Sequence, residues 1–126
     1  MSAMARIIII DDDRDVRHPL RLALENAGHD VLEAQSGTEG MRFWKDRGAD
    51  LVITDVHMPE TDGLEVVREL TALNPAVKII AISGGDSTRN FNALSDAKLF
   101  GALRTILKPF RHAELLSAID ELLGKA

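Results

Sequence analysis

The sequence predicts a single α/β domain built on a parallel β-sheet that helices cover on both faces. Two observations support this fold class. Short aliphatic runs typical of strands recur along the 126 residues, and segments with the 3.6-residue period of helices separate them. Three of these runs are almost continuously apolar, as expected for parallel strands that are buried on both faces. Strands that alternate with helices favour a doubly wound, three-layer sandwich with short right-handed connections.

Five segments are predicted to be strands because they are short, apolar and rich in β-branched residues. They are residues 6–10, 30–34, 50–54, 77–82 and 103–107. Each of them precedes a segment that has helical periodicity or that is long enough to form a helix. The expected order is therefore β-α repeated five times.

Three helices are predicted from apolar stripes. Apolar residues recur at helical spacing over 16–27, 64–73 and 115–123, and Gly28, Asn74–Pro75 and Gly124 follow these stripes as stop signals. Pro19 lies inside the first stripe and lacks an N–H group. We therefore expect either a late start of that helix or a slight bend in it.

Two further helices rest on weaker patterns. One is expected near 37–47, with Ser36 or Thr38 as its N-cap and Gly48 at its end. The other is expected at 88–100, which is the least periodic of the helical segments.

Composition limits the classes of function. The net charge is −5 and no cluster of Lys and Arg stands out, which argues against nucleic-acid binding. There is no cysteine, no signal peptide and no apolar run long enough to cross a membrane. We expect a cytoplasmic protein whose residues 1–126 form one domain, with a core of about 5–124 and no output domain.

Polar residues follow four of the predicted strands. Asp11 and Asp12 follow the first strand, Asp55 the third, Ser83 the fourth and Lys108 the fifth. Because the carboxyl ends of parallel strands share one edge, these side chains should meet in one crevice. Neighbouring carboxylates repel one another unless a cation or protons relieve them. Magnesium, which binds carboxylate and phosphate oxygens, is the natural occupant.

Four motifs in this order resemble the receiver domain of two-component response regulators. They are "IIIIDDD", "DLVITDVHMPETDG", "AISG" and "LKPF", and the resemblance covers nearly the whole chain. It implies a flavodoxin-like fold with five parallel strands in the order 2-1-3-4-5. It also implies a signalling phosphoacceptor that catalyses only its own phosphoryl transfer and dephosphorylation.

The resemblance assigns roles to individual residues. Asp55 corresponds to the phosphoacceptor and also to a Mg²⁺ ligand. Asp12 corresponds to a direct ligand, Asp11 to a ligand that acts through water, and His57 to a ligand through its backbone carbonyl. A metal site formed by the His57 imidazole is the weaker interpretation.

Other positions would contact the phosphoryl group or shape the site. Ser83 would hydrogen-bond the phosphoryl group, Lys108 would pair with Asp55 and then with a phosphoryl oxygen, and Gly84 would leave room for that group. The Lys108–Pro109 bond is expected to be cis and to orient the lysine. Gly63 would lie in the turn before the helix at 64–73.

Thr105 departs from the family pattern. Receiver domains usually carry Tyr or Phe three residues before the lysine, and this aromatic side chain turns inward on activation. We therefore expect a smaller switch, or one carried by segment 84–100 alone.

The resemblance also implies partners. A sensor histidine kinase or a histidine phosphotransfer protein would donate the phosphoryl group. A downstream protein would bind the face formed by 88–100, 103–107 and the last helix. Homodimerisation remains open, and neither nucleic acid nor membrane is expected as a partner.

Three alternative interpretations compete with this one. The acids Asp11, Asp12 and Asp13 could simply cap the first helix. A haloacid-dehalogenase-like phosphatase would use Asp11 and Asp13, but Asp15 stands where its motif needs Thr or Val. A pseudo-receiver would keep the fold and bind a partner without phosphorylation.

Overall fold

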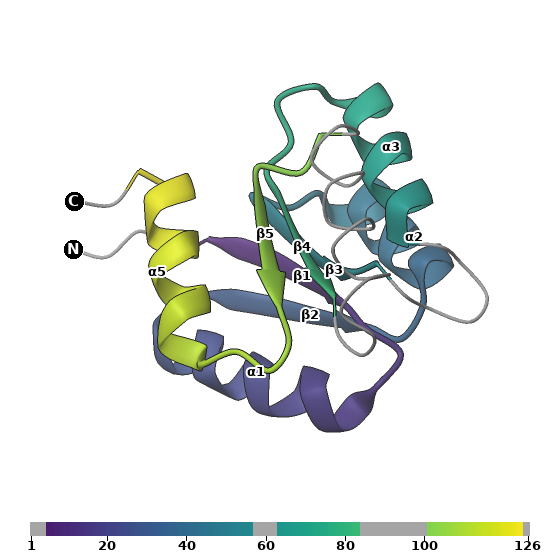
Figure 1. Cartoon of the computed structure of the whole chain (residues 1–126). Coiled ribbons are helices and arrows are strands. Elements are labelled where there is room, and N and C mark those ends of the chain that lie inside the picture. Colours follow the sequence, from purple (N-terminus) through teal and green to yellow (C-terminus); the bar gives the residue numbers. More distant parts are fainter. Residues whose placement is uncertain (1–4, 57–62, 84–100, 125–126) are drawn as a thin grey trace.

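The computed structural model describes residues 5–56, 63–83 and 101–124 (Figure 1). The predictions for His57, Gly84 and the helix at 88–100 fall outside these residues. The described elements are β1 (Arg6–Ile10), α1 (Arg14–Asn26), β2 (Asp30–Ala34), α2 (Gly37–Arg47), β3 (Leu51–Asp55), α3 (Gly63–Leu73), β4 (Ile79–Ser83), β5 (Arg104–Leu107) and α5 (His112–Leu122).

The five strands form one sheet in the order β2-β1-β3-β4-β5, and every neighbouring pair is parallel. This order confirms the predicted doubly wound topology. Strands β3 and β4 lie inside the sheet and are buried along their whole length, whereas β2 and β5 form its edges and are partly exposed. The central strands therefore tolerate only apolar residues until they reach their carboxyl ends.

Two apolar layers lie on opposite faces of the sheet. Ile8, Ile10 and Val52 point to the face covered by α2 and α3. The alternate residues, among them Ile9 and Ile53, point to the face covered by α1 and α5. Figure 1 shows these helix pairs on opposite sides of the strands, which confirms the three-layer sandwich. Among the described residues, no helix has the length and apolar character that a membrane span requires.

Helix α1 begins at Arg14, so the predicted late start caused by Pro19 is wrong. Asp13 is the N-cap, and its side chain accepts a hydrogen bond from the N–H of Asp15 at 2.9 Å. Pro19 lies inside the helix. A proline there leaves the carbonyl four residues earlier without its helical donor. The cap stabilises the start of the helix independently, by satisfying one N–H group of the first turn.

Helix α2 confirms the weaker prediction at 37–47 and decides between its two candidate caps. The hydroxyl of Ser36 accepts a hydrogen bond from the N–H of Glu39 at 3.1 Å, and Gly48 ends the helix with φ of 70°. Gly40 lets α2 approach β1, because a Cβ there would lie 2.3 Å from Cδ1 of Ile10.

Strand boundaries differ from the predictions by one or two residues. The third strand covers 51–55 instead of 50–54, and the fourth covers 79–83 instead of 77–82. In both cases the strand includes the polar residue at its end. Backbone pairing with neighbouring strands continues through Asp55 and Ser83, so their polarity does not end the strand.

Candidate functional site

The four polar strand ends meet at one edge of the sheet, as predicted. Asp55 and Ser83 are the last residues of β3 and β4, while Asp11 and Lys108 follow β1 and β5. Backbone hydrogen bonds continue beyond the strands and hold this edge. The N–H of Asp11 donates to the carbonyl of Ala34 at 3.1 Å, and the N–H of Lys108 donates to the carbonyl of Ser83 at 2.7 Å.

Lys108 connects the two buried carboxylates of the site. Its Nζ lies 3.0 Å from Oδ2 of Asp11 and 3.0 Å from Oδ2 of Asp55. The exposed fractions of these side chains are 5% for Asp11, 8% for Asp55 and 21% for Lys108. Charged groups at this depth interact more strongly than a surface pair would.

Burial and neighbouring charges shift the titration of this cluster. The pKa of Asp11 is raised, first by burial and further by the charge of Asp55, although a hydrogen bond from Asp13 and the charge of Lys108 oppose this. The pKa of Lys108 is also raised, because the charges and hydrogen bonds of the two carboxylates outweigh its burial, which acts in the opposite direction. The site therefore holds its lysine as an ammonium and resists ionisation of Asp11.

The carboxylates form a donor set that fits a hard divalent cation. Asp11, Asp12 and Asp55 each offer one oxygen, and these three atoms lie within 4.8 Å of one another. Asp12 is exposed, whereas the other two acids are buried. Three carboxylates face one ammonium, so the cluster keeps an excess of negative charge when all are ionised. Oxygen donors with excess negative charge suit Mg²⁺.

The three consecutive acids Asp11, Asp12 and Asp13 have different surroundings. Only one of them caps α1, so helix capping does not explain all three. Asp13 caps α1 with its side chain. Its N–H donates to Oδ1 of Asp11 at 2.9 Å, so the cap also holds the buried carboxylate. Asp11 faces Lys108, and Asp12 faces water.

Gly63 is the first residue of α3, so the helix begins one residue earlier than predicted and includes the glycine that was expected in the turn before it. A Cβ at this position would lie 2.0 Å from the carbonyl oxygen of Asp55 and 2.5 Å from Cα of Val56. Only glycine lets the start of α3 pack this closely on the end of β3. Its part in the site is therefore to set the position of the backbone around Asp55.

Three further predicted positions, Pro109, Ser83 and Thr105, lie within the described residues. The Lys108–Pro109 peptide bond is cis, as predicted. Ser83 is fully buried. Thr105 is half-buried and pairs in register with Ala81 of β4.

Sequence analysis missed two residues next to the site. Arg17 of α1 donates hydrogen bonds to Glu33 of β2 and to the backbone carbonyl of Asp11. One signal for this pair was available, because Glu33 is a charged residue between Leu32 and Ala34 of β2. Its partner was not evident, since that depends on how α1 lies across the sheet.

The family model of the response regulator receiver domain matches residues 7–120 of this chain. The chain belongs to this family. Receiver domains are the signalling phosphoacceptors of two-component systems, and they bind Mg²⁺ through acidic residues. They interact with sensor kinases and downstream effector domains. This family membership leaves no support for the phosphatase alternative.

Two curated relatives illustrate the range of proteins that contain such a domain. The chain is 34% identical over 120 residues to the response regulator receiver protein CpdR of Brucella abortus (strain 2308), covering 95% of this chain and 98% of CpdR. It is 39% identical over 120 residues to the response regulator MprA of Mycobacterium sp. (strain KMS), covering 95% of this chain and 51% of MprA. The receiver domain thus spans about half the length of MprA.

Solved structures agree with the fold. A response regulator receiver domain protein from Clostridium thermocellum superimposes with a TM-score of 0.89 at 30% identity, covering 96% of this chain and 95% of that one. The response regulator protein TrrA from Thermotoga maritima, in complex with Mg(2+)-BeF, gives a TM-score of 0.83 at 30% identity, covering 94% of this chain and 99% of TrrA.

Proposed function

We propose that this receiver domain accepts a phosphoryl group on Asp55 from the phosphohistidine of a sensor histidine kinase or a histidine phosphotransfer protein. The observation that supports this best is the contact of Lys108 with both Asp11 and Asp55, 3.0 Å from each, at a buried sheet edge. An ammonium between two carboxylates is positioned to exchange one of them for a phosphoryl oxygen.

In the proposed transfer, a carboxylate oxygen of Asp55 attacks the phosphorus atom. The new O–P bond forms as the P–N bond to the donor histidine breaks. The electron pair of the broken bond stays on the imidazole nitrogen, and a proton on the other ring nitrogen of the donor histidine lets the imidazole leave as a neutral ring. Because a carboxylate is a modest nucleophile, positioning and charge neutralisation must supply most of the rate.

The residues around Asp55 have separate roles in the proposed transfer. Lys108 compensates the negative charge of Asp55 before transfer and of a phosphoryl oxygen after it. The hydroxyl of Ser83 donates a hydrogen bond to the phosphoryl group. Asp11, Asp12, Asp55 and the carbonyl of His57 would hold Mg²⁺. When bound, Mg²⁺ supplies a divalent positive charge next to the phosphoryl oxygens.

Phosphorylation then signals by shifting the population of conformations. A downstream protein binds the face of β5 and α5 together with the helix predicted at 88–100, or the phosphoryl group passes to another protein. Thr105 replaces the aromatic residue usual at its position, so the conformational shift proceeds without a rotating ring. A cytoplasmic location fits this role, and the proposal holds for a monomer as well as for a homodimer.

A small phosphodonor tests the proposed function. Incubation with acetyl phosphate and Mg²⁺ should add the mass of one phosphoryl group to the intact protein, and Asp55→Asn should abolish this addition. Asp46→Asn, which changes an exposed acid of α2, serves as the matched control and should retain labelling. Failure of the wild-type protein to be labelled would favour a pseudo-receiver, and labelling that persists in Asp55→Asn would refute Asp55 as the acceptor.

A further inference from the structure

A partly buried arginine, Arg17, joins α1, β2 and the loop that carries Asp11 and Asp12. Arg17 lies in the second turn of α1, and its side chain is only 12% exposed. Its Nε donates to Oε1 of Glu33 at 2.8 Å, and its Nη1 donates to the backbone carbonyl of Asp11 at 2.7 Å. The planar guanidinium presents its donors from separate nitrogen atoms in a rigid fork, whereas a lysine ammonium presents all of them from one atom.

Glu33 anchors this arrangement. It occupies the face of β2 that α1 covers, and its side chain is 15% exposed. Burial alone would raise the pKa of Glu33, but hydrogen bonds from Arg21, Arg17 and His18 outweigh burial and lower it. Glu33 is therefore a carboxylate at neutral pH, and the positive charge of Arg17 is already balanced by it. Arg17 adds little net charge to the metal site.

The contact with Asp11 distinguishes Arg17 from the other partners of Glu33. Arg21 donates to Oε2 of Glu33 at 3.1 Å, and His18 lies 3.4 Å from the same oxygen. Neither has a hydrogen bond to Asp11 in the part of the chain that the structure describes. Glu33 would thus keep two partners without Arg17, whereas the carbonyl of Asp11 would lose its donor.

The Asp11 carbonyl belongs to the peptide that leads into Asp12. The other polar atoms of Asp11 are also held, since its N–H donates to Ala34, its Oδ1 accepts from Asp13 and its Oδ2 accepts from Lys108. Asp12 is exposed, so its position depends on the peptides on either side of it. The bond from Arg17 fixes the peptide on the Asp11 side.

We propose that Arg17 is a positioning residue of the metal site, which holds the Asp11 carbonyl and so directs the Asp12 carboxylate toward bound Mg²⁺. This inference rests on the proposed function, because Asp12 is a ligand only there. Partners that orient metal ligands typically change metal affinity by about 10- to 100-fold when they are removed. Arg17 acts through the main chain instead of touching a ligand carboxylate, so the lower end of this range is expected.

Calorimetric titration of the whole chain with MgCl₂ tests the proposal. Arg17→Ala should weaken Mg²⁺ binding about tenfold. Arg21→Ala is the matched control, because it removes an arginine one turn later that contacts the same Glu33 but not Asp11. Its Mg²⁺ affinity should stay close to that of the wild-type protein.

A second measurement needs no metal. In Mg²⁺-free buffer, amide hydrogen exchange at Asp12 and Asp13 should be faster in Arg17→Ala than in the wild-type protein and in Arg21→Ala. This measurement separates the two proposals. If the wild-type protein binds no Mg²⁺, the proposed function fails, and the exchange rates still decide whether Arg17 orders the loop.

Three outcomes would overturn the positioning role. These are unchanged Mg²⁺ affinity in Arg17→Ala, an equal loss in Arg21→Ala, and exchange at Asp12 and Asp13 that is the same in all three proteins. Should Arg17→Ala fail to fold, Arg17→Lys replaces it. The lysine keeps the charge beside Glu33 but lacks the rigid fork of separate donor nitrogens. A folded Arg17→Lys protein should therefore still bind Mg²⁺ more weakly, and wild-type affinity would contradict the proposal.

Discussion

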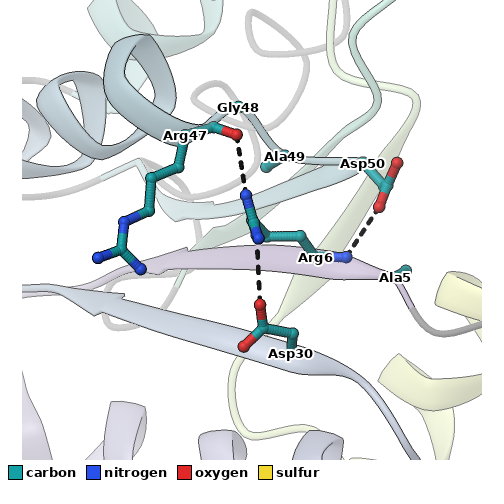
Figure 2. A pocket seen from close by; sticks show the side chains of 7 residues that line it. All are labelled: Ala5, Arg6, Asp30, Arg47, Gly48, Ala49 and Asp50. Atoms are coloured by element: carbon teal, nitrogen blue, oxygen red, sulfur yellow. Dashed lines mark hydrogen bonds and ion pairs between the residues drawn. The ribbon is translucent and has the colours of Figure 1, made fainter.

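Charged residues gather at both ends of the parallel strands, at the edge formed by the carboxyl ends (the carboxyl edge) and at the edge formed by the amino ends (the amino edge). The two groups differ in their burial and in the balance of positive and negative charge. At the carboxyl edge, Lys108 faces Asp11 and Asp55 in a buried position. At the amino edge, Arg6 lies in a pocket of about 380 Å³ between the start of β1 and residues 47–50 (Figure 2). Its side chain is 40% exposed, and that of its partner Asp30 is 55% exposed.

Figure 2 shows how Arg6 uses its donors at the amino edge. Its Nε donates to Asp30 at 3.2 Å, its Nη1 to the carbonyl of Arg47 at 2.9 Å, and its backbone N–H to Asp50 at 2.8 Å. The Arg47 carbonyl lies at the end of α2, where helical carbonyls lack internal partners. These contacts therefore tie the start of β2, the end of α2 and the residue before β3 to β1.

The difference supports placing the proposed reactive site at only one of these edges. Exposed ion pairs in water contribute little energy and leave no group in an unfavourable state. Buried carboxylates that outnumber their cation are held in a state that an incoming cation improves. A hollow lined by charged residues is therefore a weaker sign of chemistry than a buried imbalance of charge.

The largest expected effect is a difference in the loss of stability when a glycine at each edge is replaced by alanine. Gly63→Ala should destabilise the fold by about 3 kcal/mol, since the new methyl group would overlap backbone atoms of Asp55 and Val56. Gly48→Ala at the amino edge meets no atom within 4 Å, and only its φ of 70° opposes the change, so about 1 kcal/mol is expected. Urea denaturation of both variants checks this order, and equal losses would mean that α3 can move away from β3 without cost.

A second substitution tests whether the carboxyl edge is held in an unfavourable state. Asp11→Asn should stabilise the Mg²⁺-free protein by about 1 kcal/mol at neutral pH, because it removes a buried carboxylate. The pKa of Asp11 is raised in the folded state, so its ionisation opposes folding above that pKa and has no effect well below the ordinary value of 3.8. The gain should therefore shrink as the pH falls toward 3.8.

Asp30→Asn is the control at the amino edge. It removes an exposed partner of Arg6 and should destabilise the fold slightly, by less than about 1 kcal/mol. Stability curves against pH for both variants provide the comparison. If Asp11→Asn were the more destabilising of the two at neutral pH, the contact with Lys108 would outweigh the cost of burying the carboxylate.

Much of the carboxyl edge could be predicted from the sequence, because strand ends in a parallel sheet must share an edge. That rule alone brings Asp11, Asp55, Ser83 and Lys108 together once the strands are recognised. The fold class could also be predicted, because apolar runs typical of strands alternate along the chain with apolar stripes typical of helices. These features depend on local pattern and on topology, which the sequence expresses directly.

Other features depend on how elements pack, which local pattern does not express. The link between Arg17 and Glu33 requires the rotation of α1 over β2. His29, a polar residue in the connection between α1 and β2, is only 5% exposed. The close approach of Gly63 to Asp55 likewise depends on the spacing between α3 and the sheet.

The smallest expected effect concerns the amino edge. Arg6→Met keeps an apolar stem of similar length but removes the contacts with Asp30 and with the carbonyl of Arg47. The backbone bond to Asp50 does not involve the side chain and should remain. Destabilisation of about 0.5 kcal/mol is expected in urea, decreasing as salt is added, because the lost ion pair is exposed.

The same variant should be labelled by acetyl phosphate at the wild-type rate, because β1 separates Arg6 from Asp11 by its full length. Labelling is the more informative of its two measurements. A slower rate at unchanged stability would mean that β1 transmits the loss of Arg6 contacts to the acids that follow it. The amino edge would then help to position the reactive edge, and the two groups of charges would have to be treated as one coupled system.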